Sequence, residues 1–177
     1  MSGAADTSAA AWKDAVFAAL KDAGVTQLYY VPDAGHARVI SLAEADPDIA
    51  TVVLTTEEEG VAACAGAWLG GARAALLMQS SGVGNCLNML SLIETCRLPM
   101  LMLVTMRGEW AEFNPWQVPM GRAAETVLGA LSVRCLRIDL AEDAGEVVSS
   151  AAELAYGAEQ AVAVLIGQRL IGRKVWR

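Results

Sequence analysis

The sequence has few of the residues from which metal sites and hydrolytic triads are built. His36 is its only histidine, and its four cysteines, Cys64, Cys86, Cys96 and Cys135, include no Cys-x-x-Cys pair. A structural zinc site needs about four clustered cysteine or histidine ligands, and a serine triad needs a histidine beside its nucleophile. The cysteines are therefore interpreted as reduced packing residues, and no metal site is expected in this chain.

Long apolar runs and basic clusters are also scarce. No apolar run approaches the roughly 20 residues that span a membrane, and residues 1–11 lack the layout of a signal peptide. The 13 Lys and Arg residues are outnumbered by 20 Asp and Glu residues. The basic residues cluster only in the C-terminal tail, 169–177. This tail could contact an anion, but a role as a strap that docks on its own or a neighbouring subunit is favoured. We expect a cytoplasmic protein with no membrane or nucleic-acid partner.

Apolar residues, in contrast, are abundant. They make up 55% of the 177 residues, and the mean hydropathy is +0.39. The length fits a single domain covering residues 1–177, with flexible ends at about 1–8 and 170–177. High hydropathy without a membrane segment predicts an apolar interface with another subunit, and therefore an oligomer.

Helical and strand patterns alternate along the chain. A helix ending near Gly24 is followed by six β-rich runs with helical segments between most of them. This order predicts an α/β fold, a doubly wound and mostly parallel six-stranded sheet with helices on both faces. The expected strands are 27–31, 51–54, 74–79, 100–105, 133–138 and 161–166. The expected helices include 37–45, 85–95, 142–156 and one that begins near residue 57. Residues 107–121 are expected to be irregular.

Polar residues follow several of these strands. In an open parallel sheet the ligand crevice lies beyond the carboxyl ends of the strands. The segments expected there are 32–36, 55–59, 79–88 and 106–121. Glu57, Gln79, Asn85 and Arg107 should therefore approach one rim.

Three consecutive acids, Glu57, Glu58 and Glu59, open a helix of small apolar residues. Thr56 and Glu59 have the spacing of a capping box, which favours a purely structural role for the acids. The helix behind them has almost no polar face, which indicates burial. One of the acids could instead point into an apolar crevice, where burial favours the protonated carboxyl group. Both interpretations remain open on spacing alone.

A glycine-containing segment, Gln79-Ser-Ser-Gly-Val-Gly-Asn85, follows the third expected strand. It lacks the third glycine of the dinucleotide fingerprint, where Leu87 stands, and no Lys-Ser or Lys-Thr follows to form a nucleoside triphosphate loop. By itself it indicates only a tight strand-to-helix turn, with Gln79 and Asn85 bonding to the backbone.

Taken in order, these motifs resemble the pyrimidine-binding domain of thiamine diphosphate-dependent 2-oxoacid decarboxylases, above all the sulfopyruvate decarboxylase alpha subunits and the phosphonopyruvate decarboxylases. The resemblance extends from about Trp12 to Arg169. The motifs that carry it are Glu57-x-x-Gly-Val-x-x-x-x-Gly66, Met78-Gln-Ser-Ser-Gly-Val-Gly-Asn85 with Asn88, Pro99-Met-Leu-Met-Leu103, Arg107-Gly-Glu109 and Gln117-Val-Pro-Met-Gly121.

The resemblance implies a role for the first acid. In the family the glutamate that matches Glu57 hydrogen-bonds a ring nitrogen of the cofactor's aminopyrimidine and promotes the tautomer that activates the thiazolium ring. Glu58 and Glu59 do not match it and are left with capping and surface roles. Gln79 joins Glu57 as an expected cofactor contact. Gly82, Gly84 and Asn85 match the segment beside the pyrimidine.

The resemblance also implies a substrate-side loop at Asp33, but the sequence departs from the family there. The decarboxylases usually continue with a serine and then a lysine, whereas this chain has Ala34, Gly35, His36 and Arg38. His36 could be a proton donor or an ordinary loop residue. Arg38 or Arg107 could replace the lysine in binding a sulfonate or phosphonate.

The second departure is an absence. The Gly-Asp-Gly motif with its following Asn, which holds Mg²⁺ and the diphosphate in the family, does not occur in this sequence. We therefore expect an alpha-type subunit that shares thiamine diphosphate with a diphosphate-binding beta-type subunit, which would hold Mg²⁺. The expected reaction is decarboxylation of sulfopyruvate to sulfoacetaldehyde. The alternatives are decarboxylation of phosphonopyruvate or another 2-oxoacid, and a non-catalytic doubly wound binding module.

Overall fold

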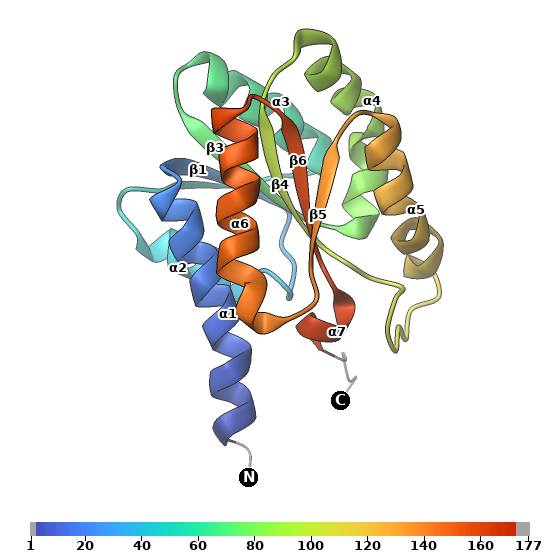
Figure 1. Cartoon of the computed structure of the whole chain (residues 1–177). Helices are drawn as coiled ribbons and strands as arrows, with labels where there is room; N and C mark the ends of the chain where they lie inside the picture. Colours follow the sequence, from blue (N-terminus) through green and yellow to red (C-terminus); the bar gives the residue numbers. More distant parts are fainter. Residues whose placement is uncertain (1–2, 173–177) are drawn as a thin grey trace.

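The computed structural model describes residues 3–172, with side chains from residue 11 onward, as a six-stranded sheet between two layers of helices (Figure 1). All strand pairs are parallel, and the strand order is β2-β1-β3-β4-β6-β5. The strands are β1 (Val25–Tyr30), β2 (Ala50–Val53), β3 (Arg73–Gln79), β4 (Met100–Thr105), β5 (Arg134–Ile138) and β6 (Ala161–Ile166). The predicted doubly wound α/β class is confirmed.

The helices cover both faces of the sheet. One face packs against α1 (Gly3–Asp22), α2 (Ala37–Ala45) and α6 (Ala144–Ala152), and the other packs against α3 (Glu57–Leu69), α4 (Ser80–Cys96) and α5 (Gln117–Ala130) (Figure 1). A short α7 (Gln168–Ile171) follows β6, a 3₁₀ turn (Ala141–Asp143) precedes α6, and a π-helical turn (Glu153–Gly157) follows it. The central strand β4 is buried along its whole length, because helices lie on both of its faces.

The direction in which successive strands are added across the sheet reverses between β1 and β3. From β1 the chain continues outward to β2, whereas β3 and β4 extend the sheet on the other side. Loops on the two sides of such a switch point diverge and leave a crevice at the carboxyl ends of the strands. The segments after β1, β3 and β4 all end at this crevice.

Two predicted boundaries are wrong. Helix α4 begins at Ser80 rather than near Asn85, so that the expected glycine turn forms the first turns of a helix. Helix α5 begins at Gln117, inside the segment expected to be irregular. Pro119 is compatible with this start, because the backbone N–H groups of a first helical turn have no intrahelical acceptor.

The capping box predicted at the start of α3 is not formed. Thr56 is the N-cap residue, but its side chain makes no capping hydrogen bond. Glu59 reaches back toward the helix start, but its Oε2 accepts a hydrogen bond from the backbone N–H of Thr55, one residue before the N-cap, at 2.9 Å. Glu59 therefore stabilises the entry to α3, and Glu57 does not take part in this contact.

The four cysteines are free thiols, and Cys64 and Cys86 are buried. Burial raises the pKa of both thiols to about 12, which makes them unreactive at neutral pH. The predicted packing role is confirmed for these two residues. Within residues 3–172, no helix combines the length and the apolar character needed to cross a membrane.

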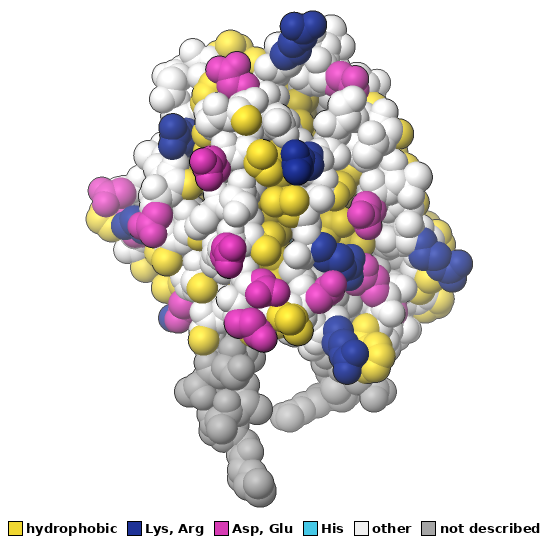
Figure 2. Space-filling model, in the orientation of Figure 1, with side chains coloured by type: hydrophobic (Ala, Val, Ile, Leu, Met, Phe, Trp, Pro, Cys, Tyr) yellow, Lys and Arg dark blue, Asp and Glu magenta, His cyan; other side chains and the backbone are white. Residues whose placement is uncertain are grey.

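Charged and large apolar side chains are distributed differently over the surface. Acidic and basic side chains are interspersed over the face that α1 and α6 cover (Figure 2). Large exposed apolar side chains occur on β2, α3, α4 and the segment between β4 and α5; they include Val53, Leu69, Leu92, Trp110, Phe113 and Trp116. The basic tail expected to act as a strap lies mostly in residues 173–177, outside the described residues.

Candidate active site

Glu57 is the first residue of α3, and its side chain is buried at the switch point of the sheet. The residue is only 8% exposed. Its Oε2 accepts a hydrogen bond from Nδ2 of Asn85 on α4 at 2.7 Å. Sequence reasoning expected both residues on one rim, and the structure places them in direct contact.

Gly82 explains how α4 can approach this carboxylate. A Cβ atom at position 82 would lie 2.5 Å from Cγ, Cδ and Oε1 of Glu57. Any side chain there would displace the carboxyl group, so glycine at this position is required by close packing. Gly84, by contrast, faces Met120 of α5, whose Sδ would be 3.1 Å from an added Cβ. The structure therefore gives Gly84 a helix-packing contact and does not place it against Glu57.

Asp33, in the loop after β1, is the centre of a second polar cluster. Its Oδ1 accepts a hydrogen bond from Nε2 of Gln79 at 2.6 Å, and its Oδ2 accepts from Oγ1 of Thr105 at 2.7 Å and from the N–H of Gly35 at 3.0 Å. Three donors thus fix the orientation of this carboxylate. Gln79 and Thr105 are the last residues of β3 and β4, so the cluster links three strand ends.

Three cavities border Asp33; one of about 470 Å³ lies along α2, and the other two are lined by further residues of the candidate site. The first of these two, of about 170 Å³, is lined by Glu57, Asp33, Gln79 and Ser81 together with Val31 and Pro32. The second, of about 140 Å³, lies on the other side of Asp33; its lining includes Lys13, Thr105, Arg107 and Gln168. The candidate site therefore has a compartment beside the buried acid and a compartment with two cationic residues.

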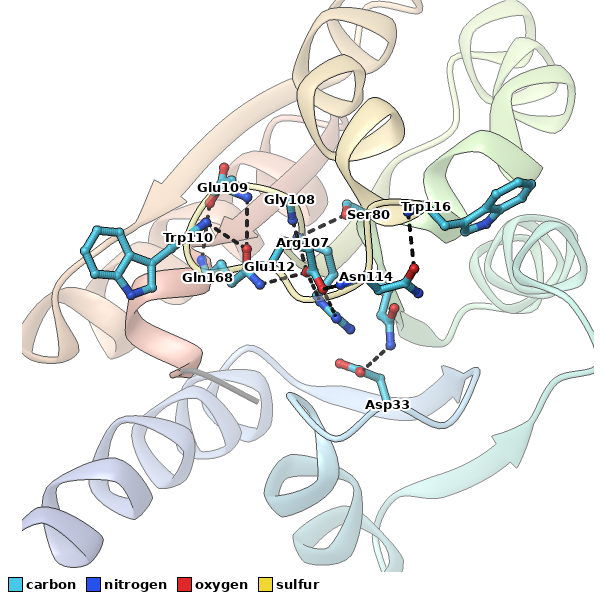
Figure 3. Close-up of polar contacts among 11 residues, drawn as sticks. Asp33, Ser80, Arg107, Gly108, Glu109, Trp110, Glu112, Asn114, Trp116 and Gln168 are labelled. Atoms are coloured by element: carbon cyan, nitrogen blue, oxygen red, sulfur yellow. Dashed lines mark hydrogen bonds and ion pairs between the residues drawn. The ribbon is translucent and has the colours of Figure 1, made fainter. Parts of the chain in front are cut away.

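Arg107 is anchored by a buried carboxylate. Its Nε and Nη2 both donate to Glu112 at 2.7 Å (Figure 3), and the Glu112 side chain is only 3% exposed. Glu112 also accepts hydrogen bonds from the backbone N–H groups of Gly108 and Asn114. The guanidinium fork, assisted by these donors, lowers the pKa of Glu112 to about 2.

Gln168, which opens α7, holds the same segment from the other side. Its Oε1 accepts from the N–H groups of Glu109 and Trp110 at 2.9 Å, and its Nε2 donates to Glu112 at 2.8 Å (Figure 3). The segment between β4 and α5 is therefore irregular in backbone but fixed by hydrogen bonds. Its exposed aromatic residues, Trp110, Phe113 and Trp116, surround this fixed core.

His36 lies beneath the site rather than at its surface. It is 1% exposed, and its Nε2 is 3.2 Å from the carbonyl oxygen of Met78 and 3.1 Å from that of Leu103. Both neighbours are acceptors, so Nε2 is assigned the hydrogen, which it shares between β3 and β4. Burial lowers the pKa of His36 and keeps the ring neutral. Of the two roles left open for His36, this geometry supports the structural one.

Arg38 is directed away from the cavities. Its guanidinium pairs with Asp14 of α1 at 2.7 Å, and both side chains are nearly half exposed. The proposed tail-binding role of Arg38 is therefore not supported, because α2 points its second residue toward α1.

Sequence reasoning missed four residues of this region. Thr105 could have been found from its place at the end of β4, and Glu112 from its position in a long polar segment near Arg107. Lys13 and Gln168 carry no such signal. Lys13 lies about 20 residues before Asp33, and Gln168 lies about 60 residues after Arg107, so only the tertiary structure brings them to the same cavity.

Comparison with known proteins identifies the family of the chain. Residues 11–113 match the family described as "Thiamine pyrophosphate enzyme, N-terminal TPP binding domain"; thiamine pyrophosphate is another name for thiamine diphosphate. The matched region contains Asp33, Glu57, Gln79, Asn85 and Arg107.

The chain is also similar to curated relatives over most of its length. It is 35% identical over 154 residues to the sulfopyruvate decarboxylase subunit alpha of Methanococcus maripaludis, covering 86% of this chain and 92% of the relative. It is 38% identical over 154 residues to the subunit of the same name from Methanothermobacter thermautotrophicus, covering 86% of this chain and 93% of that relative. A phosphonopyruvate decarboxylase from Streptomyces viridochromogenes is 36% identical over 113 residues, which is 63% of this chain and 28% of that protein.

A solved structure shows the same fold. The 2-oxoglutarate:ferredoxin oxidoreductase from Magnetococcus marinus superposes with a TM-score of 0.75 over 91% of this chain and 29% of that one, at 18% sequence identity. The chain therefore belongs to the thiamine pyrophosphate enzyme family and carries its N-terminal TPP binding domain.

Proposed function

We propose that this chain is the alpha-type subunit of a thiamine diphosphate-dependent decarboxylase that converts sulfopyruvate to sulfoacetaldehyde and carbon dioxide. The observation that carries the proposal is the carboxyl group of Glu57, which is buried, held by Asn85 and closely covered by Gly82 beside a small cavity. The substrate is inferred from the relatives named sulfopyruvate decarboxylase subunit alpha.

The residues around Glu57 fit an aminopyrimidine ring. Such a ring presents nitrogen donors and acceptors along one edge and apolar faces. The cavity offers a carboxylate and the Gln79 side chain as polar partners, and Val31 and Pro32 as apolar wall. We propose that Glu57, Gln79 and Asn85 hold the pyrimidine end of the cofactor, with Gly82 allowing α4 to pack closely against Glu57.

Thiamine diphosphate, when bound, supplies the electron sink that decarboxylation of a 2-oxoacid requires. The contribution of this chain is to place a proton-sharing group at the pyrimidine. Asn85 donates to Oε2 of Glu57, and within the described residues Oε1 has no hydrogen-bond partner. Glu57 can therefore share a proton at Oε1 while Asn85 fixes the orientation of the carboxyl group.

The diphosphate end and its Mg²⁺ are assigned to a partner subunit of the beta type. The sequence lacks the Gly-Asp-Gly motif with its following Asn, and the relatives are named as alpha subunits. The exposed apolar residues of β2, α3 and α4 provide surface for such a partner. We expect a hetero-oligomer in which each active site needs both chains.

Isothermal titration of thiamine diphosphate with Mg²⁺ tests the division between subunits. The chain with a co-expressed partner that carries Gly-Asp-Gly and Asn should bind the cofactor tightly, and the chain without the partner should bind it weakly. Equally tight binding by this chain alone would contradict the shared site.

The variant Glu57→Gln tests the catalytic role. It keeps the size of the side chain and should assemble with the partner, as measured by size-exclusion chromatography. Because it cannot share a proton as a carboxylic acid does, decarboxylation should fall by about 10²- to 10⁴-fold, the usual contribution of general acid–base groups. Full activity in this variant would remove Glu57 from the mechanism.

The similarity to a phosphonopyruvate decarboxylase makes phosphonopyruvate the second candidate substrate. The reconstituted pair should be assayed with sulfopyruvate, phosphonopyruvate and pyruvate at equal concentration. Preference for phosphonopyruvate would change the substrate but keep the reaction. Absence of decarboxylation with all three would favour a non-catalytic binding module.

A further inference from the structure

The cavity beyond Asp33 has a charge pattern that the cofactor site does not explain. Two cationic side chains, Lys13 of α1 and Arg107 after β4, line it with one anionic side chain, Asp33. Its volume of about 140 Å³ is on the scale of a few water molecules, which suits a small group such as a sulfonate.

Arg107 is fixed on one edge and free on the other. Its fork to Glu112 uses two of the five N–H donors of the guanidinium group. The other three make no hydrogen bond within the described residues. Glu112 is buried and does not line the cavity, so it orients Arg107 without presenting its own charge to a ligand. Arg107 and Gln168 lie across from Asp33 (Figure 3).

Lys13 differs from the other cations near this region. Lys21 pairs with Asp46, Arg38 with Asp14, and Arg137 with Glu109. Lys13 forms no ion pair within residues 11–172, and its ammonium group lies 5.3 Å from the centre of the Trp12 ring. An ammonium group in this position has three donors available to an anion in the cavity.

The position of the cavity indicates which part of a substrate it would meet. Asp33 lines both this cavity and the one that Glu57 lines. The reacting carbonyl of a 2-oxoacid must lie toward the cofactor and hence toward Glu57. The part of the substrate that extends past Asp33 is therefore its tail. Because the Asp33 carboxylate repels anions, a tail with negative charge needs both cations to offset that repulsion.

We propose that Lys13 is a specificity-determining residue that binds the anionic tail of the substrate, with Arg107 as its second contact and Glu112 as the positioning residue of Arg107. The inference rests on the proposed decarboxylase function. It assigns the selection of a sulfonate-bearing 2-oxoacid over pyruvate to a residue of α1, which lies far from Glu57 in the sequence.

The test compares Lys13→Gln with the wild-type pair of subunits on sulfopyruvate and on pyruvate, which lacks the tail. A charge-assisted hydrogen bond at a partly exposed site supports an effect of about tenfold. The KM for sulfopyruvate should rise by about that factor with kcat changed less than about twofold, and KM for pyruvate should stay constant. Lys13→Arg should restore most of the affinity. Lys21→Gln, on the exposed part of the same helix, is the matched control and should behave as wild type.

A binding measurement separates this inference from the proposed function. Titration of the assembled protein with 3-sulfopropionate, which has the sulfonate tail but no keto group, should show affinity weakened about tenfold in Lys13→Gln. If the wild type decarboxylates none of the 2-oxoacids, the function fails while this titration still tests Lys13. Unchanged KM and unchanged affinity would overturn the inference. Equal losses on sulfopyruvate and pyruvate would overturn it as well, because they would place Lys13 at the carboxylate or in the fold.

Discussion

The substitution Gly82→Ala tests whether the activity of the protein depends on the close approach of α4 to Glu57. The new Cβ would lie 2.5 Å from three atoms of the Glu57 side chain, about 1 Å closer than an ordinary contact between heavy atoms. Glu57 cannot simply turn away, because its Oε2 is bonded to Asn85 at 2.7 Å. The carboxyl group must therefore shift by an amount of that order.

The effects on stability and on activity should differ strongly. Overpacking of this kind costs about 1–3 kcal/mol, whereas alanine in a helix is favoured over glycine by about 1 kcal/mol. The net destabilisation is then at most about 2 kcal/mol, which lowers the Tm of a chain of this size by less than about 8 °C. A misplacement of about 1 Å in a catalytic group can reduce the rate by about 100-fold.

The assay is kcat for sulfopyruvate with the reconstituted pair, measured at a temperature well below the Tm of both proteins. Gly129→Ala on α5 is the matched control, since nothing lies within 4 Å of the added Cβ. The control should keep its activity and gain about 0.5–1 kcal/mol of stability. The reasoning is refuted if Gly82→Ala retains activity within about twofold of wild type, because Glu57 would then tolerate the displacement that the packing demands.

Two further predictions concern the residues that support the site. Arg107 holds the pKa of Glu112 at about 2, below its ordinary value of 4.5, so the ionised form contributes about 3 kcal/mol of stability above pH 4.5 that is lost as the pH falls from 4.5 to 2. In Glu112→Gln the free energy of unfolding should be lower near neutral pH and should approach the wild-type value toward pH 2; a gap that stays constant with pH would contradict this account. His36→Ala leaves two strand carbonyls without their shared donor and should lower the free energy of unfolding by about 1–3 kcal/mol, measured by denaturant titration, whereas kcat below the Tm should stay close to wild type. A large loss of kcat at full stability would instead support the proton-donor role.

Much of the fold follows from local patterns. The bounds predicted for α2 and β4 match the structure, because the amphipathic pattern of 37–45 and the apolar run after Pro99 each favour one structure. The start of α4 was missed, because Gly82 and Gly84 have a low intrinsic preference for helix. Their place in α4 depends on contacts with Glu57 and Met120, and such contacts are not visible in the local sequence.

Some residues of the candidate site were likewise predicted from the sequence, and others were not. Glu57, Gln79 and Asn85 were expected from their positions after strands, and Asp33 from the family resemblance. The structure joins these four residues in two hydrogen-bonded pairs. Arg38 was expected beside them but pairs with Asp14, because the direction of a side chain on a helix depends on how that helix packs.

The sequence by itself determined the class of fold, placed Glu57 at the start of a helix after a strand, and led us to expect a partner subunit, since periodicity, strand order and the presence or absence of motifs are properties of the chain alone. Only the tertiary structure decided that Arg107 is oriented by Glu112, that His36 supports two strands from below, and that Lys13 opens on the same cavity as Asp33. The physical reason is that parallel strands bring distant segments to one edge, where distances and hydrogen-bond partners depend on packing rather than on spacing along the chain.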